Sequence, residues 1–153
     1  MWKNCSIHVA FSALGSLLFV VSAVGGAIYL YLGRFELPDK SEHFSKLVNK
    51  IRYRLNFTYT SVGFILFTIG VGLGFLRAKE VWHGYFKPDA KVIVSIIIWL
   101  YYLAFFAIIT RLSLKNAPNK ERVFSILSFV GAILILINFV IVNFYLTSLH
   151  HYL

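Results

Sequence analysis

Four long stretches of this sequence contain no Asp, Glu, Lys or Arg, and they constrain the fold more than any other feature. They cover residues 4–33, 55–76, 92–110 and 123–153. A helix rises about 1.5 Å per residue and the hydrocarbon core of a bilayer is roughly 30 Å thick, so about 20 apolar residues are needed to cross it. Each stretch is long enough to span a bilayer, and the sequence therefore predicts four transmembrane helices.

Composition excludes the main alternatives to a membrane protein. Hydrophobic residues make up 59% of the 153 residues and charged residues only 14%, whereas an average soluble domain is about 25% charged. One soluble domain of this length could not bury so much apolar surface. Disordered chains are polar and poor in aromatic residues, and this chain is 18% aromatic. We therefore expect an all-α integral membrane protein of a bacterial inner membrane or its organellar equivalent.

The prolines and the charged residues mark the connections between the predicted helices. Pro38, Pro88 and Pro118 all lie between the charge-free stretches, which is expected because an interior proline disrupts a helix. We expect one membrane domain over residues 1–153, a bundle of four transmembrane helices. Its helices are expected at about 5–33, 56–76, 92–110 and 123–149, with connections at 34–55, 77–91 and 111–122.

The distribution of basic residues predicts the orientation of the bundle. Ten of the 15 Lys and Arg residues lie in the connections 34–55 and 111–122. By the positive-inside rule these two connections face the cytoplasm, so both termini and the connection 77–91 face the outer, periplasmic side. Membrane topology thereby accounts for the net charge of +9, and we expect no nucleic-acid partner.

Four of the five histidines gather on the predicted outer face. His8 is near the start of the first helix, His150 and His151 are at the end of the last, and His83 is in the connection 77–91. Neutral imidazoles on two helices suit the axial positions of a haem iron. His8 and His150 are the expected metal ligands if the first and last helices are neighbours, with His83 and His151 as reserves. Interfacial histidines without a ligand are the competing interpretation, and a zinc or copper site is disfavoured because few carboxylates or thiols accompany them.

The connection between the second and third helices is rich in aromatic residues. Trp82, Tyr85 and Phe86 lie there, followed by Asp89. Such residues could cover a flat macrocycle, or form an aromatic belt of the kind that marks membrane interfaces in many proteins. Asp89 could also cap the third helix.

Small and polar residues inside the predicted spans are interpreted as helix-packing features. The glycines of Gly70-x-Gly72-x-Gly74 lie within an apolar span, so they are more typical of close helix packing than of a phosphate-binding loop. Asn138 lies within the last span, where an amide is expected to form an interhelical hydrogen bond.

Three segments resemble one family of membrane proteins. The segment 81–91, Val-Trp-His-Gly-Tyr-Phe-Lys-Pro-Asp-Ala-Lys, resembles the tryptophan-rich signature of the haem-handling cytochrome c assembly proteins of the CcsA, ResC and CcmC type. The start of the chain, from His8 to about residue 18, is similar to that family's opening helix. Residues 142–152 are similar to its closing segment, and all three occur in the family's order.

The resemblance implies a haem site on the outer face. Haem b would be held between two histidines, and the matching positions are His8 and His150. The family's signature lies over the haem, and the matching residues are Trp82, Tyr85, Phe86 and Asp89. Phe86 and Pro88 stand where the family has its second and third tryptophans, so the contact with haem is expected to differ.

Three functions remain open from the sequence. The first is a haem-handling subunit of cytochrome c maturation, in the manner of a component of a cytochrome c haem lyase. The second is a membrane cytochrome b subunit that retains haem for electron transfer between quinol and periplasmic cytochromes. The third is a structural subunit without haem. The partners implied are membrane lipid, other membrane subunits of a haem-handling or respiratory complex, and cytochrome c or apocytochrome c.

Overall fold

The computed structural model describes residues 3–32, 42–81 and 90–140, with side chains described for 7–31, 47–76 and 92–140. This part of the chain forms four helices, α1 (Lys3–Leu32), α2 (Glu42–Val81), α3 (Ala90–Leu114) and α4 (Lys120–Val140). Each contains a segment long and apolar enough to cross a membrane. The prediction of an all-α protein with four membrane-spanning helices is confirmed.

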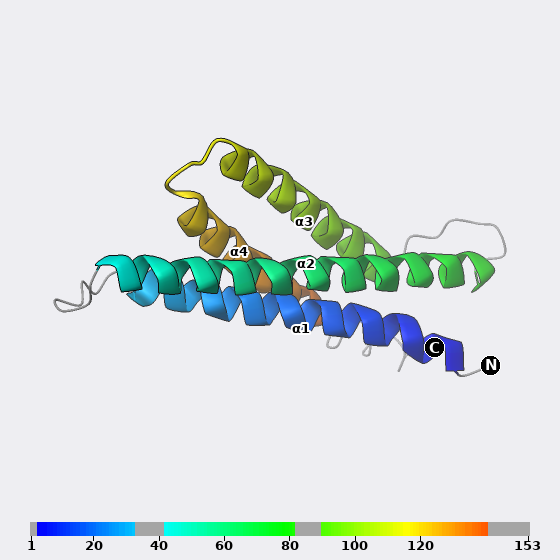
Figure 1. Ribbon diagram of the computed structural model, residues 1–153. Helices are drawn as coiled ribbons and strands as arrows, with labels where there is room; N and C mark the ends of the chain where they lie inside the picture. The colour runs from blue at the N-terminus through cyan, green and yellow to red at the C-terminus, as the bar shows by residue number, and fades with distance from the viewer. Residues whose placement is uncertain (1–2, 33–41, 82–89, 141–153) are drawn as a thin grey trace.

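The four helices pack in a closed ring. α1 contacts α2 and α4, and α3 contacts α4 and α2. Figure 1 shows α1 and α2 side by side along most of their length, with α3 and α4 crossing them obliquely. Gly26, late in α1, lies against Ser125, early in α4. The two helices are therefore antiparallel neighbours, and α4 runs from the end of α1 back toward its beginning.

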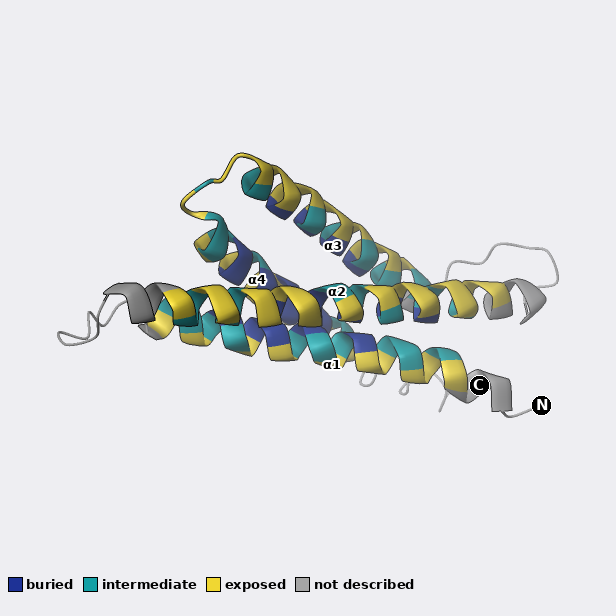
Figure 2. Ribbon diagram, viewed as in Figure 1, coloured by how far each residue is buried: buried dark blue, intermediate teal, exposed yellow. Residues whose placement is uncertain are grey.

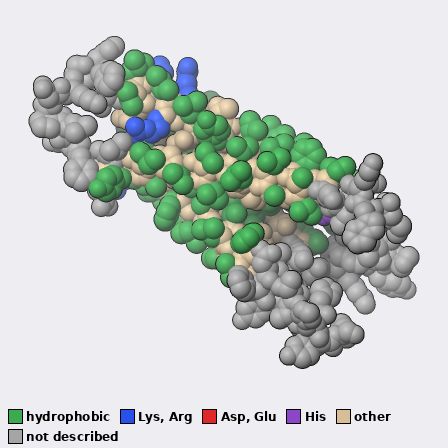
Figure 3. All heavy atoms as spheres, turned by 90° about the horizontal axis from the view of Figure 1, so that it is seen from below, with side chains coloured by type: hydrophobic (Ala, Val, Ile, Leu, Met, Phe, Trp, Pro, Cys, Tyr) green, Lys and Arg blue, Asp and Glu red, His purple; other side chains and the backbone are tan. Residues whose placement is uncertain are grey.

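The two ends of the ring differ in charge. The end of α1, the start of α2, the end of α3 and the start of α4 share one end, which we call the basic end. The described basic side chains there are Lys50, Arg52, Arg54, Arg111, Lys115, Lys120 and Arg122. The opposite end holds the start of α1 and is called the His8 end. Figure 3 shows hydrophobic side chains over the middle of the molecule, with Lys and Arg toward one end and a histidine toward the other.

Aromatic side chains from all four helices form the core. Phe19 of α1 stacks on Tyr102 of α3 with ring centroids 3.6 Å apart, and it also contacts Phe67 of α2. Phe105 of α3 meets Phe124 of α4 edge to face at 5.2 Å. Most other large apolar side chains are exposed along the helices (Figure 2). This pattern is stable in lipid, where exposed apolar surface carries no hydration cost.

Helix α2 is longer than the charge pattern predicts. The expected helix begins at about residue 56, whereas α2 begins at Glu42 and runs without interruption to Val81. Leu47, Ile51 and Leu55 recur at helical spacing among the basic residues of this extension, so it is amphipathic. The charged residues therefore do not mark where the helix begins.

The turn between α3 and α4 ends the third helix by a Schellman motif. Asn116 has a positive φ of 48°. The amide of Ala117 donates to the carbonyl of Leu112 at 3.0 Å, and the amide of Asn116 donates to that of Ser113 at 3.1 Å. Asn tolerates the left-handed conformation at this position, and the proline that follows, Pro118, cannot continue the helix. α4 is thereby returned along the bundle toward the His8 end.

Candidate functional site

His8 is the candidate ligand whose surroundings the structure describes. It lies two turns into α1 and is half-buried. Its imidazole packs beside Gly74 of α2, so that a Cβ at position 74 would lie 3.5 Å from the ring carbon Cδ2. One turn earlier in α2, a Cβ at Gly70 would lie 3.0 Å from the His8 carbonyl oxygen. The glycines therefore let this turn of α1 lie directly on α2, with room for the imidazole ring.

The two helices also approach closely at other glycine positions of the α1–α2 contact. A Cβ at Gly15 would lie 2.7 Å from the carbonyl oxygen of Gly63 and 2.8 Å from the amide nitrogen of Phe67. Ser12 is similarly pressed against Gly70. The packing interpretation of the glycine run is thus confirmed for Gly70, and small residues set the position of His8 relative to α2.

Buried hydroxyl groups reinforce the same contact nearer the basic end. The hydroxyl oxygens of Ser22 and Thr60 are 2.7 Å apart, and they lie 3.1 and 3.0 Å from the carbonyl oxygen of Asn56. Gly25 leaves the space that the Asn56 side chain occupies. In a membrane-spanning segment, polar groups that bond across helices hold the pair in a fixed register.

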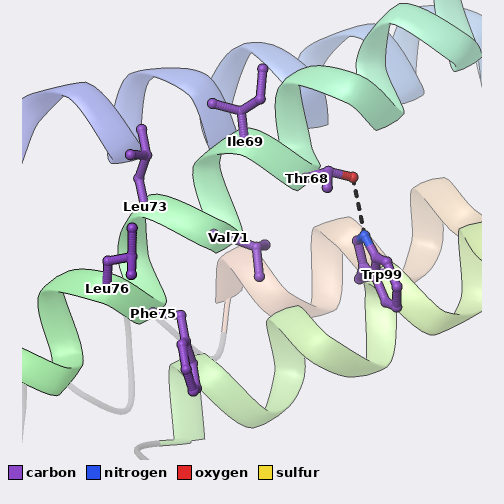
Figure 4. A pocket seen from close by; sticks show the side chains of 8 residues that line it. Thr68, Ile69, Val71, Leu73, Phe75, Leu76 and Trp99 are labelled. Atoms are coloured by element: carbon purple, nitrogen blue, oxygen red, sulfur yellow. Dashed lines mark hydrogen bonds between the residues drawn. The ribbon is translucent and has the colours of Figure 1, made fainter.

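A groove opens between α2 and α3 on the other side of α2. Its volume is about 610 Å³, and it is lined by Thr68, Ile69, Val71, Gly72, Leu73, Phe75, Leu76 and Trp99. Trp99 of α3 donates its indole N–H to the Thr68 hydroxyl at 3.0 Å, which closes one end of the groove (Figure 4). Gly72 faces this space, because a Cβ there would have nothing within 4 Å. Of the glycine run, Gly72 therefore has a different environment from Gly70.

The hydrogen bond predicted for Asn138 is not seen at its side-chain oxygen. Its Oδ1 atom is buried without a hydrogen-bond partner among the residues that the structure describes. Asn138 lies in the last described turn of α4. A buried amide oxygen of this kind is an acceptor available to a bound group, and the sequence pattern alone did not separate it from a satisfied amide.

Most of the predicted site lies beyond the part of the chain that the structure describes. These residues are Trp82, His83, Tyr85, Phe86, Asp89, His150 and His151. The pairing of His8 with His150 requires the first and last helices to be neighbours. This condition is met, since α1 and α4 are neighbours. In residues 3–32, 42–81 and 90–140, no three His, Cys, Asp or Glu side chains group as a metal site would require.

Sequence reasoning missed two features beside the candidate site. One is the α2–α3 groove, for which the sequence held no clear signal, because Gly72 in the groove and Gly70 in the tight contact look alike in it. The other is the hydroxyl cluster of Ser22 and Thr60. Hydroxyl residues within apolar spans were its signal, but their pairing depends on how α1 and α2 align.

Comparison with known proteins gives consistent matches. A profile described as cytochrome C assembly protein matches residues 3–150. The chain is 32% identical over 156 residues to Protein NrfI of Wolinella succinogenes, which covers 99% of this chain and 16% of that protein. It is 31% identical over 98 residues to the cytochrome c biogenesis protein CcsA of Synechococcus sp. (strain CC9605), covering 64% of this chain and 31% of that protein.

The spinach protein of the same name, from Spinacia oleracea, is 30% identical over 119 residues, covering 78% of this chain and 32% of that protein. The chain thus spans about a third or less of the length of these relatives. No solved structure matches the chain. The profile covers nearly the whole sequence, and its spans are those of an integral membrane protein. The chain therefore belongs to the cytochrome c assembly protein family.

Proposed function

We propose that this chain is a haem-handling membrane protein of cytochrome c biogenesis, which holds haem b at the His8 end. His8 and His150 are the proposed axial ligands, and Trp82, Tyr85, Phe86 and Asp89 the residues that cover the haem. The proposed partners are apocytochrome c and further membrane subunits. The observation that carries the proposal is the closed ring, in which α4 runs antiparallel beside α1 toward the turn that holds His8.

The surroundings of His8 fit one of the two axial ligands of the proposed haem site. Haem b supplies, when bound, an iron whose two axial positions accept imidazole nitrogens. His8 is half-buried on a membrane-spanning helix, and Gly74 gives its ring room beside α2. Gly70 fixes the backbone of the same turn. This turn is therefore held in place by packing, as a ligand must be to keep its orientation.

The order of the described helices supports the other half of the proposed haem site, which consists of the aromatic connection and His150. Residues 82–89 join the end of α2 to the start of α3, and both helix ends lie at the His8 end of the bundle. Residues 141–153, which include His150, follow α4 after Val140. The basic residues at the other end support an orientation with the His8 end on the outer side of the membrane.

A spectrum of the purified, haem-loaded protein tests the ligand pair. We expect His8→Ala and His150→Ala each to remove or shift the absorbance of six-coordinate haem, because each removes one axial nitrogen. His43→Ala is the matched control and should leave the spectrum unchanged, since His43 is near the start of α2 at the basic end. Unchanged spectra in both test variants would refute the pair. Loss with His151→Ala instead of His150→Ala would reassign the second ligand.

Haem titration of the apo-protein tests the aromatic connection. Burying an aromatic side chain contributes on the order of 1.5–3 kcal/mol, so Trp82→Ala should weaken haem binding roughly 10- to 100-fold. Trp99→Phe, which alters a tryptophan between α2 and α3, is the control and should leave the haem Kd unchanged. Equal Kd values for the wild type and Trp82→Ala would leave Trp82 as an interfacial anchor only.

A further inference from the structure

A second pocket lies at the basic end of the bundle, far from the candidate haem site. It has a volume of about 480 Å³ and lies between the first turns of α2 and the start of α4. Its lining residues are Asn49, Lys50, Tyr53, Arg54, Lys120 and Glu121. Nothing in the haem-handling proposal uses this pocket or these residues.

The pocket concentrates positive charge. Lys50 and Arg54 are four residues apart on α2 and so lie on the same face, where like charges repel unless an anion lies between them. Lys120 comes from α4, and its Nζ atom lies 5.7 Å from the centre of the Tyr53 ring. Three cations from two helices thus surround one space, with the amide of Asn49 as a further hydrogen-bond donor.

The acidic residue in the lining also has neighbours outside this pocket. Glu121 lines a second, smaller pocket together with Tyr29 of α1 and Arg52 of α2. Glu121 is the only acidic residue whose side chain lies in the described ranges 7–31, 47–76 and 92–140. Within those ranges one carboxylate lies beside three cations, so the pocket has a surplus of positive charge.

The depth of the pocket indicates the kind of anion. Arg54 immediately precedes the charge-free residues 55–76 of α2, and Lys120 is three residues before the charge-free segment that begins at Val123. A rise of about 1.5 Å per residue places both cations within one turn of the hydrocarbon boundary. That is the level of lipid phosphates, where basic side chains next to membrane spans contact anionic headgroups.

We propose that this pocket binds the phosphate of an anionic phospholipid headgroup, held by Lys50, Arg54 and Lys120. Ammonium and guanidinium groups together form charge-assisted hydrogen bonds to phosphate oxygens. Tyr53 and Asn49 line the pocket beside them. The lipid would connect α2 to α4, two helices that lie across the ring from each other.

Lipid binding to the purified full chain tests this site. Native mass spectrometry in detergent, with phosphatidylglycerol or phosphatidylcholine added, gives the affinity for each lipid. We expect a clear preference for phosphatidylglycerol in the wild type. Each cation near an anionic headgroup is worth about fivefold in affinity, so Lys50→Gln/Arg54→Gln should weaken phosphatidylglycerol binding by at least about tenfold. Lys120→Gln alone should weaken it by about fivefold.

The chain offers a matched control for the double variant. Arg111 and Lys115 are also four residues apart at the basic end, but they lie outside the pocket lining. Arg111→Gln/Lys115→Gln removes the same charge and should change the affinity less than twofold. Equal losses in both double variants would mean diffuse attraction to the membrane and would overturn the site. Far-UV circular dichroism checks that each variant is folded, and Lys120→Gln decides the question if the double variant is not.

Inorganic phosphate distinguishes a lipid from a soluble anion. We expect millimolar inorganic phosphate to leave phosphatidylglycerol bound, because the acyl chains hold the headgroup at the pocket. Displacement of the lipid by phosphate, together with direct phosphate binding that is lost in Lys50→Gln/Arg54→Gln, would overturn the lipid assignment in favour of a soluble phosphate. A wild type with no preference between the two lipids would overturn the proposal as a whole.

Discussion

Helix α2 makes two contacts of opposite character, one with α1 and one with α3. Against α1 it presents Gly63 and Gly70, and the two backbones approach until no side chain fits between them. On the side of α3 it presents Gly72 among larger side chains, and a groove of about 610 Å³ is left open there. The difference shows that one helix can be closely packed on one face and leave open space beside its other face.

The two contacts also use polar groups differently. The α1–α2 contact contains buried hydroxyls at Ser22 and Thr60, with relative exposures of 1% each. The α2–α3 contact has the bond from Trp99 to Thr68, and Thr68 is exposed at the rim of the groove. The buried hydroxyls between α1 and α2 are shielded from lipid and specify the register of the two helices. The bond from Trp99 to Thr68 instead lies at the edge of an open space. The position of His8 thus depends on the tighter contact.

The largest expected effect comes from adding one methyl group to the tight contact. Gly15→Ala would place its Cβ 2.7 Å from a backbone oxygen and 2.8 Å from a backbone nitrogen of α2, and backbone atoms cannot move aside as a flexible side chain can. We expect the free energy of unfolding to fall by about 2–3 kcal/mol, as overpacking does in other well-packed contacts. Titration of the detergent-solubilised protein with SDS, followed by circular dichroism, measures it.

The tight contact would be refuted if Gly15→Ala had the stability of the wild type. The same variant also tests the link to His8. Because the ring of His8 lies on the glycine face of α2, separation of α1 from α2 should lower haem affinity together with stability. A loss of stability with unchanged haem binding would show that the ligand does not depend on this packing.

The sequence predicts the number of spans well, because lipid imposes a strict limit on charge within them. It does not predict the length of α2, since charged residues such as Lys50 and Arg54 are compatible with a helix that emerges from the membrane. It also does not separate Gly70 from Gly72. Which of two glycines faces a partner depends on how neighbouring helices are rotated, and that rotation is set by contacts far apart in sequence.

For the candidate site, the described residues test one condition only, because most of its predicted residues lie outside them. The pairing of His8 with His150 required the first and last helices to be neighbours, and α1 and α4 are neighbours. Asn138 shows the limit of such reasoning, because an amide in an apolar span looks like a bonded one until its surroundings are known. That its buried oxygen has no hydrogen-bond partner among the described residues depends on how the helices pack.

A smaller effect is expected from the bond across the open contact. Trp99→Phe removes the indole N–H that donates to Thr68 at 3.0 Å while keeping an aromatic ring beside Phe64. Hydrogen bonds between membrane helices contribute about 0.6 kcal/mol on average. A double-mutant cycle with Thr68→Val should give a coupling energy of this size. A coupling energy of zero would mean that apolar contacts alone hold α3 against α2.

The smallest effect is expected from the same substitution as the first, made on the other face of α2. Gly72→Ala places a methyl group in the groove, where nothing lies within 4 Å of it. Alanine is the better helix former by up to about 1 kcal/mol in an exposed helix interior, so stability should stay unchanged or rise slightly in the SDS titration. Gly15→Ala and Gly72→Ala are chemically identical changes in two apolar spans. Any difference between them therefore measures the space around each position, and a loss of stability in Gly72→Ala comparable to that in Gly15→Ala would mean that the groove is closed when the protein is in its membrane.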